Sequence, residues 1–179
     1  MKARTLSDEA LRALIRVGEP VKLTGENLEG ADLEGANLRE ADFEGANLRG
    51  ACLANADLSR ANLSWARLDG ADLTGARLME ARLPHAHLEE ARLARVHAGR
   101  ADMRWTRLRE ADLSEADLVG ADLQGAEMWK TRLHRTRMTL DTMHGLERHL
   151  SATQLAGLEL YGTSPLGVPA SPAVDPLPA

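Results

Sequence analysis

A five-residue repeat constrains this chain more than any other feature of its sequence. Between residues 30 and 51 the chain reads GADLEGANLREADFEGANLRGA, in which Ala and a large apolar residue recur at every fifth position. An α-helix would rotate each successive pair by about 140° and would leave no apolar stripe to bury. A single straight strand would point successive pairs to opposite faces, because side chains alternate along a strand and five is odd.

A chain that turns after every pentad keeps all of these side chains on one side. Within each pentad the chain runs extended, so that the first and third residues point inward and the second, fourth and fifth face water. The repeat runs from residue 21 to residue 140 without insertion or deletion, as 24 pentads, with Ala first in 18 and Leu third in 19. Gly ends nine of the pentads, where we expect turns with positive φ. Self-similarity this strict predicts a solenoid.

Outward-facing charges indicate how many pentads make one coil. Charged residues 20 positions apart, at the same place in the pentad, form 17 pairs of opposite sign and 3 of like sign. At a spacing of 15 the counts are 9 and 8, and at 25 they are 6 and 7. Side chains directly opposite one another on neighbouring strands favour unlike charges, so we expect residues n and n+20 to stack. Four pentads then form each lap of a roughly square cross-section, and the 24 pentads form about six parallel coils.

Composition divides the chain into four parts. Residues 1–20 are expected to form a helical N-terminal cap, and the β-helix is expected over residues 21–140. Residues 141–161 are expected to form a C-terminal cap, in which the segment beginning at Ser151 has the spacing of a capping box. Residues 162–179 hold five of the seven prolines and are expected to form an extended or disordered tail.

Composition and spacing argue against catalytic, metal, cofactor and membrane functions. The net charge of −5 does not indicate nucleic-acid binding, and no apolar run reaches the ~20 residues needed to cross a bilayer. The lone Cys52 cannot form an intrachain disulfide and fits a reducing compartment, so we expect a cytoplasmic protein. His85 and His87 lie in different pentads, which favours solvated histidines over a metal pair. Most carboxylates have an Arg partner 20 residues away, so we expect no catalytic residues, no cofactor and no metal.

Two groups of outward-facing residues are candidate protein-binding sites. Trp65, His85 and Trp105 share the fifth pentad position at intervals of 20 and should form a column, which either anchors a partner or only covers neighbouring turns. Residues 26–80 carry 11 acidic and 5 basic side chains, for −6, and residues 81–140 carry 9 acidic and 11 basic, for +2. The acidic candidates are Asp32, Glu34, Asp42 and Glu44. We expect them on two adjacent faces near the N-terminal end, where they either steer a basic partner or remain solvated.

The repeat units resemble those of the pentapeptide-repeat proteins. Units such as ADLEG, ANLRG, ADLTG and ADLVG have the A(D/N)LxG form of that family, and the repeat covers about 120 of the 179 residues. The resemblance implies an all-β fold, a right-handed parallel quadrilateral β-helix, in agreement with four pentads per coil. We expect short capping helices at both ends. In the pentad VHAGR the small Ala98 departs from the pattern and predicts a local void or bend.

The resemblance also implies possible functions. Well-characterised bacterial members resemble duplex DNA in width and charge, bind type II topoisomerases and protect gyrase from quinolones. This implies DNA gyrase or topoisomerase IV as a partner, without direct binding of nucleic acid. A DNA mimic should carry sustained rows of carboxylates, whereas here the sign of the charge alternates along each face. The alternative is a rigid scaffold or adaptor that holds another protein, with no role at a topoisomerase.

Family members often pair through their C-terminal ends, which makes a homodimer a further expectation. The same apolar segment could instead be a lid folded on its own rod. The candidate residues for either contact are Leu146, Leu150, Leu155, Leu158 and Leu160.

Overall fold

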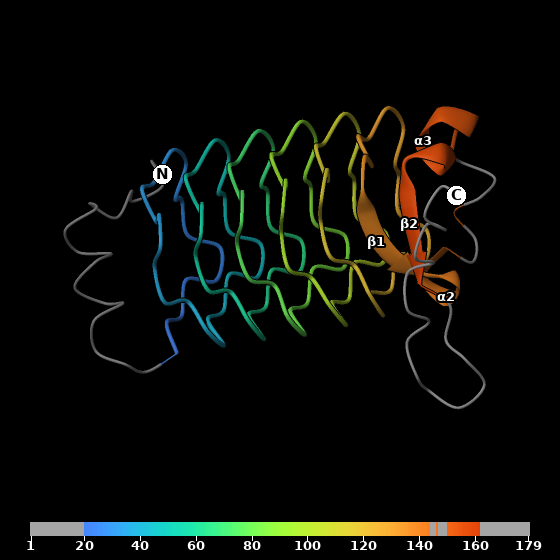
Figure 1. The fold of residues 1–179 in the computed structure, drawn as a ribbon. Coiled ribbons are helices and arrows are strands. Elements are labelled where there is room, and N and C mark those ends of the chain that lie inside the picture. The colour runs from blue at the N-terminus through green and yellow to red at the C-terminus, as the bar shows by residue number, and fades with distance from the viewer. Residues whose placement is uncertain (1–19, 144–145, 147–149, 162–179) are drawn as a thin grey trace, which may run out of the picture.

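The repeat forms a solenoid whose coils stack in parallel (Figure 1). The computed structural model describes residues 20–143, 146 and 150–161. Parallel bridges join second-position residues to those 20 positions later, from Lys22–Asp42 to Asp117–Arg137. The stacking of n on n+20 is therefore confirmed, and four pentads make each lap. The helix expected before residue 20 and the tail from residue 162 onward lie outside the described residues.

A tight turn at the end of each pentad produces the corners. The N–H of a first-position residue donates to the carbonyl of the third-position residue before it, as Ala46 does to Phe43 at 2.9 Å. The fifth residue, third in this turn, has φ between +56° and +75° in every pentad from 21–25 to 131–135. A type II turn requires this conformation. Nine of these corner residues are Gly and fourteen are not. Residues such as Trp, His, Arg and Glu therefore also adopt the left-handed backbone conformation at the corners.

Backbone hydrogen bonds between coils satisfy the extended part of each pentad. In the pentad 46–50, Leu48 N–H donates to Arg67 O at 2.7 Å, and Arg67 N–H donates in return to Ala46 O at 2.9 Å. The third-position side chain is buried in all 24 pentads. The core therefore consists of third-position side chains, mostly Leu, that stack from one coil to the next. The outward-facing residues do not pack in this core and are free to vary.

The pentad 96–100 departs from the consensus without breaking the ladder. Ala98 N–H donates to Asp117 O at 2.8 Å, and Leu78 N–H donates to His97 O at 2.7 Å. The larger Val96 replaces Ala at the first position and is fully buried. The coils therefore pass the small Ala98 without a shift of register.

Four short elements close the C-terminal end (Figure 1). They are β1 (Thr136–Thr139), α2 (Leu140–Met143), α3 (Ala152–Ala156) and β2 (Leu158–Tyr161). Because Leu140 begins α2, the last expected pentad has no corner and the repeat ends one residue early. β2 pairs with β1 in parallel, with Thr136 opposite Leu158, an offset of 22 residues instead of 20. No helix in the described ranges is long and apolar enough to cross a membrane.

The helix α3 covers the open edge of the last coil. Ser151 and Gln154 form the predicted capping box, in which the Ser151 side chain accepts from Gln154 N–H and the Gln154 side chain accepts from Ser151 N–H. The Gln154 amide also donates to the carbonyls of Met128, at 3.1 Å, and Thr131, at 2.9 Å. The Met128 carbonyl also accepts from Thr131 N–H within its turn, whereas the Thr131 carbonyl, which no further coil reaches, is satisfied by Gln154.

The apolar residues of the C-terminal segment divide into two groups. Leu146 and Leu150 are buried in the core, and Leu158 packs against it. Leu155 and Leu160 remain 36% and 49% exposed. The first group serves as a lid on the rod, whereas the second is available for contact with another molecule.

Candidate interaction surface

Trp65, His85 and Trp105 lie in one column at a corner of the solenoid. The ring centroids of Trp65 and His85 are 4.1 Å apart at an interplanar angle of 12°, and those of His85 and Trp105 are 6.5 Å apart at 8°. The two indoles are nevertheless 57% and 54% exposed. The n+20 register therefore holds the rings parallel to one another while leaving much of their surface to solvent. Their role in binding a partner stays a prediction.

Trp105 also covers a turn, as the alternative interpretation of the column requires. A Cβ atom added at Gly125 would clash with three atoms of the Trp105 ring, and Gly125 has φ of +73°. Gly125 therefore suits this corner for two reasons. Glycine adopts a positive φ readily, and its lack of a Cβ atom leaves room for the Trp105 ring. Covering this turn does not bury Trp105, since more than half of it stays exposed.

Trp129 belongs to the same surface, although the 20-residue spacing of the column does not predict it. It is 59% exposed, and Lys130 Nζ lies 4.2 Å from its ring centroid, a cation–π contact. A hollow of about 440 Å³ is lined by both Trp105 and Trp129. The position of Trp129 could have been inferred from the sequence. Gly125 occupies the same corner as Trp105, 20 residues later, and the pentad 126–130 that contains Trp129 begins directly after Gly125. We call Trp65, His85, Trp105 and Trp129 the aromatic surface.

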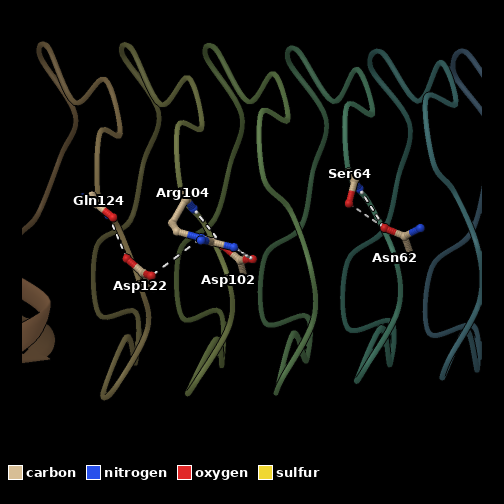
Figure 2. A network of polar contacts seen from close by, with 6 residues as sticks. All are labelled: Asn62, Ser64, Asp102, Arg104, Asp122 and Gln124. Atoms are coloured by element: carbon tan, nitrogen blue, oxygen red, sulfur yellow. Dashed lines mark hydrogen bonds and ion pairs between the residues drawn. The ribbon is translucent and has the colours of Figure 1, made fainter.

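A polar network borders this corner on the neighbouring face (Figure 2). Arg104 donates from Nε and Nη2 to the Asp102 carboxylate at 2.8 Å each and lies 3.6 Å from Asp122. Gln124 N–H donates to the side chain of Asp122 at 3.0 Å. The hydrogen bonds from Arg104 hold the pKa of Asp102 below its usual range, against the opposing effect of burial. Asp102 and Asp122 are like-charged neighbours, and Arg104 lies between them.

The four acidic candidates do not share one surface. Asp32 and Glu34 stand in one pentad, whereas Asp42 and Glu44 stand in the pentad ten residues later. Ten residues are half a lap, because the stacked residues are 20 apart. The two pairs therefore lie on opposite faces, and the expectation of adjacent faces is wrong. The error has a simple cause: the whole pentad 36–40 separates the two pairs.

Neutral donors hold the second acidic pair in place. The Asn62 amide donates to Asp42 at 3.1 Å and to Glu44 at 3.2 Å, and the Thr24 hydroxyl donates to Asp42 at 2.9 Å. These hydrogen bonds orient the carboxylates without neutralising them. Lys22 lies opposite Asp42 in the neighbouring coil, so this face of the first coils carries two carboxylates and one lysine.

Further along the rod, arginines and carboxylates pair between coils. Arg60 lies 3.0 Å from Glu80 and 3.9 Å from Glu40. A second column, at another place in the pentad, includes the pairs Arg92–Asp72 at 3.3 Å and Arg132–Asp112 at 3.7 Å. The alternation of charge in the sequence is thus an alternation in space, and it interrupts any continuous row of carboxylates.

Asp69 and Glu89 form a like-charged pair one coil apart. Burial first, and then the neighbouring Asp69, raise the pKa of Glu89 to about 6. Asp69, His87 and Glu89 offer ligand atoms within 4.8 Å of one another, as do the more exposed Asp32, Glu34 and Cys52. Arginine nitrogens lie 3.9 to 4.0 Å from the Asp69 and Glu89 carboxylates, and their charge opposes the binding of a cation at the first group.

The repeat matches the family of pentapeptide repeats. Eight copies match over residues 27–64, 56–95 and 101–139. The break between the last two ranges falls at the pentad of Ala98, whose residues depart from the consensus. No curated protein matches the chain significantly.

Several solved structures are similar to the chain. A pentapeptide repeat protein (Rfr23) from the cyanobacterium Cyanothece 51142 is 26% identical over 63% of this chain and 83% of its own, with a TM-score of 0.36. A thylakoid-lumen protein from Arabidopsis thaliana is 17% identical over 87% and 88%, with a TM-score of 0.39. QnrB1, a plasmid-mediated fluoroquinolone resistance protein, is 23% identical over 79% and 86%, with a TM-score of 0.41. The family match, which covers more than half of the chain, carries the assignment: this protein belongs to the pentapeptide-repeat family, and its fold is a quadrilateral β-helix.

Proposed function

We propose that this chain is a non-catalytic module that binds another protein through its aromatic surface. The observation that carries the proposal is that all three tryptophans of the chain are more than half exposed, and that they gather at one corner and the face beside it. Tryptophan is strongly enriched among residues that dominate binding energy. Exposed aromatic patches on a soluble protein commonly mark an interaction site.

The fixed orientation of the stacked aromatic rings supports the same proposal. The stacking of Trp65, His85 and Trp105 fixes their orientation before a partner arrives. A preorganised surface loses little side-chain entropy on binding. Pentapeptide-repeat proteins are in general non-catalytic, and we extend this to the present chain.

Substitution of the indoles tests the proposal. Trp65→Ala and Trp105→Ala should each weaken the capture of bound proteins from extracts of the native organism, measured by quantitative mass spectrometry. Met79→Ala is the matched control, because Met79 is an exposed apolar residue on a different face. Equal recovery of every bound protein with all three variants would refute a role for the aromatic surface.

The topoisomerase hypothesis is the second candidate, and one observation favours it. Asp42 and Glu44 lie together on one face of the first coils, with Lys22 opposite Asp42, and a basic protein surface could dock there. Against it, the acidic pairs lie on opposite faces, and later carboxylates pair with arginines. Duplex DNA, in contrast, carries one charge per ~1.7 Å. Supercoiling by purified gyrase, with and without a quinolone, decides the matter: no effect at micromolar protein excludes protection of gyrase.

Two further properties belong to the proposal. A homodimer through the C-terminal end is supported by the exposed Leu155 and Leu160. Light scattering on Leu160→Asp, compared with the unaltered chain, tests it: a monomeric mass for both proteins refutes the dimer.

A cytoplasmic location is supported by Cys52 as the single cysteine. Recovery of the protein in an oxidising compartment would contradict it.

A further inference from the structure

The corner that carries the aromatic column is open at one end. The Trp65 ring stacks on His85, which follows it by one coil, with the ring centroids 4.1 Å apart. One coil before Trp65, Gly45 occupies the same corner, and a Cβ atom added there would meet no described residue within 4 Å apart from its chain neighbours. At the other end of the column, in contrast, the Trp105 ring lies over Gly125. The face of Trp65 that points away from His85 therefore borders an unfilled place in the column.

A carboxylate lies next to this unfilled place. Glu44 directly precedes Gly45 in the chain, and its Oε2 atom accepts from the Asn62 amide at 3.2 Å. Asn62 is held in turn by Ser64, whose hydroxyl donates to Asn62 Oδ1 at 2.6 Å (Figure 2). Asn62 and Ser64 belong to the pentad that ends at Trp65. The network therefore draws the Glu44 carboxylate toward the coil of Trp65.

The charge of Glu44 is not balanced by its neighbours. Its amide donor, Asn62, is neutral, and Glu44 forms no ion pair within the described ranges. Asp42, whose side chain accepts from Glu44 N–H at 3.1 Å, adds a second negative charge, and Lys22 lies opposite Asp42. A cation on the open face of Trp65 would therefore be attracted by the ring and by the Glu44 carboxylate together.

The chain already makes a contact of this kind elsewhere on the aromatic surface. Lys130 Nζ lies 4.2 Å from the centroid of the Trp129 ring and 3.4 Å from a carboxylate oxygen of Glu110, one coil earlier. An indole and a carboxylate from the preceding coil thus suffice to hold a cation. At Trp65 the carboxylate again comes from the preceding coil, whereas the described part of the chain places no cation on the ring. The cation at Trp65 then has to come from another molecule.

We propose that the partner protein presents an arginine whose guanidinium group lies on the open face of Trp65 and pairs with Glu44. The guanidinium is planar, stacks on aromatic faces and donates to a carboxylate from two nitrogens. Neighbouring coils lie about 4.8 Å apart, so a flat group above Gly45 continues the column of parallel rings by one place. This inference rests on the proposed protein-binding function and names the group that the aromatic surface recognises.

Titration of the full-length chain with acetyl-arginine amide, at constant ionic strength, tests the proposal. The indole N–H signals of the ¹⁵N-labelled protein, assigned with Trp→Phe variants, report each ring separately by NMR. The Trp65 signal should shift and saturate, and acetyl-citrulline amide, which has a similar shape but no charge, should bind about ten-fold more weakly.

Two matched variants locate the carboxylate. Glu44→Gln should weaken the binding of acetyl-arginine amide about ten-fold, because the charged acceptor is lost. Glu34→Gln is the control, since Glu34 has the same place in its pentad and the same backbone hydrogen bond, to Asp32 at 3.3 Å, on the opposite face. The control should leave the titration of Trp65 unchanged.

Several outcomes overturn the proposal. Equal affinity in Glu44→Gln, or equal affinity for acetyl-citrulline amide or acetyl-phenylalanine amide, shows that the place takes a neutral or apolar group. A shift of the Trp65 signal when the protein alone is concentrated shows that a second copy of the chain fills the place.

The capture experiment separates this inference from the protein-binding function. A bound protein whose recovery falls with Trp65→Ala but not with Glu44→Gln retains the function and overturns the arginine proposal. Recovery that falls with Trp65→Ala and Glu44→Gln alike, but not with Glu34→Gln, supports both. Recovery that is independent of Trp65 and Trp105 refutes the function itself and this inference with it.

Discussion

Gly45 and Gly125 occupy equivalent corners, so replacing each with Ala separates two costs that are usually measured together. Gly45 has φ of +65° with open space around its Cβ position, whereas Gly125 has φ of +73° and lies under the Trp105 ring. The left-handed conformation costs a non-Gly residue about 1 kcal/mol, so Gly45→Ala should lower the free energy of unfolding by about that amount. Gly125→Ala should cost about 2 kcal/mol, because the exposed indole must also rotate away from its stacked position.

Urea unfolding followed by circular dichroism measures both variants. Adding Trp105→Ala to Gly125→Ala removes the clash, so the double-mutant cycle should bring the cost of Gly125→Ala back to about 1 kcal/mol. Iodide quenching of the single variant should rise as the ring leaves the column. Equal destabilisation by Gly45→Ala and Gly125→Ala, with or without Trp105, would refute the placement of the indole over this turn.

Other predictions concern the core, the cap and pH. Leu73→Ala, at a fully buried position, should lower the free energy of unfolding by about 2–5 kcal/mol in urea titrations, whereas the exposed Leu155→Ala should change it by about 0.5 kcal/mol or less. Gln154→Ala removes the donor to the Thr131 carbonyl and one of the two donors to the Met128 carbonyl, and it should cost about 1 kcal/mol, with faster amide exchange confined to the last coil. The raised pKa of Glu89, about 6, means that its protonated form stabilises the fold below about pH 4.5 and that this stability is lost as the pH rises through 6. Glu89→Gln should therefore raise the urea midpoint at pH 7.5 and leave it unchanged at pH 4; equal shifts at both values would contradict the assignment.

The regular part of this fold can be predicted from the sequence because each lap repeats the same physical problem. Burial of the third-position side chains and alternation of charge at n+20 are local rules that act in every coil, so they leave a signal in one sequence. The capping box at Ser151 is predictable for the same reason, since it depends on two side chains three residues apart.

Two features of the fold escaped prediction, one at the end of the repeat and one within it. The 22-residue offset between β1 and β2 is set by the length of the segment that crosses the end of the rod, and no periodicity encodes it. The positive φ of fourteen non-Gly corners follows from the turn and not from the residue type, because the stacked coils impose it.

The candidate site shows the same limit. The column of Trp65, His85 and Trp105 follows from the n+20 rule, whereas Trp129 stands at a different position of the pentad and joins the surface only through the corner between two faces. The opposite placement of the two acidic pairs was within reach of the sequence, since it needs only a count of pentads around one lap.

Disulfide formation from the native Cys52 tests the 20-residue register most directly. Cys52 is bridged to Asp72 in the next coil, and neighbouring strands lie about 4.8 Å apart, within the reach of a disulfide. In dilute oxidised protein, Asp72→Cys should form an intrachain disulfide with Cys52, seen by loss of free thiol, while Arg67→Cys and Arg77→Cys should retain two free thiols. Rapid oxidation of Arg67→Cys or Arg77→Cys, with Asp72→Cys left reduced, would contradict four pentads per lap.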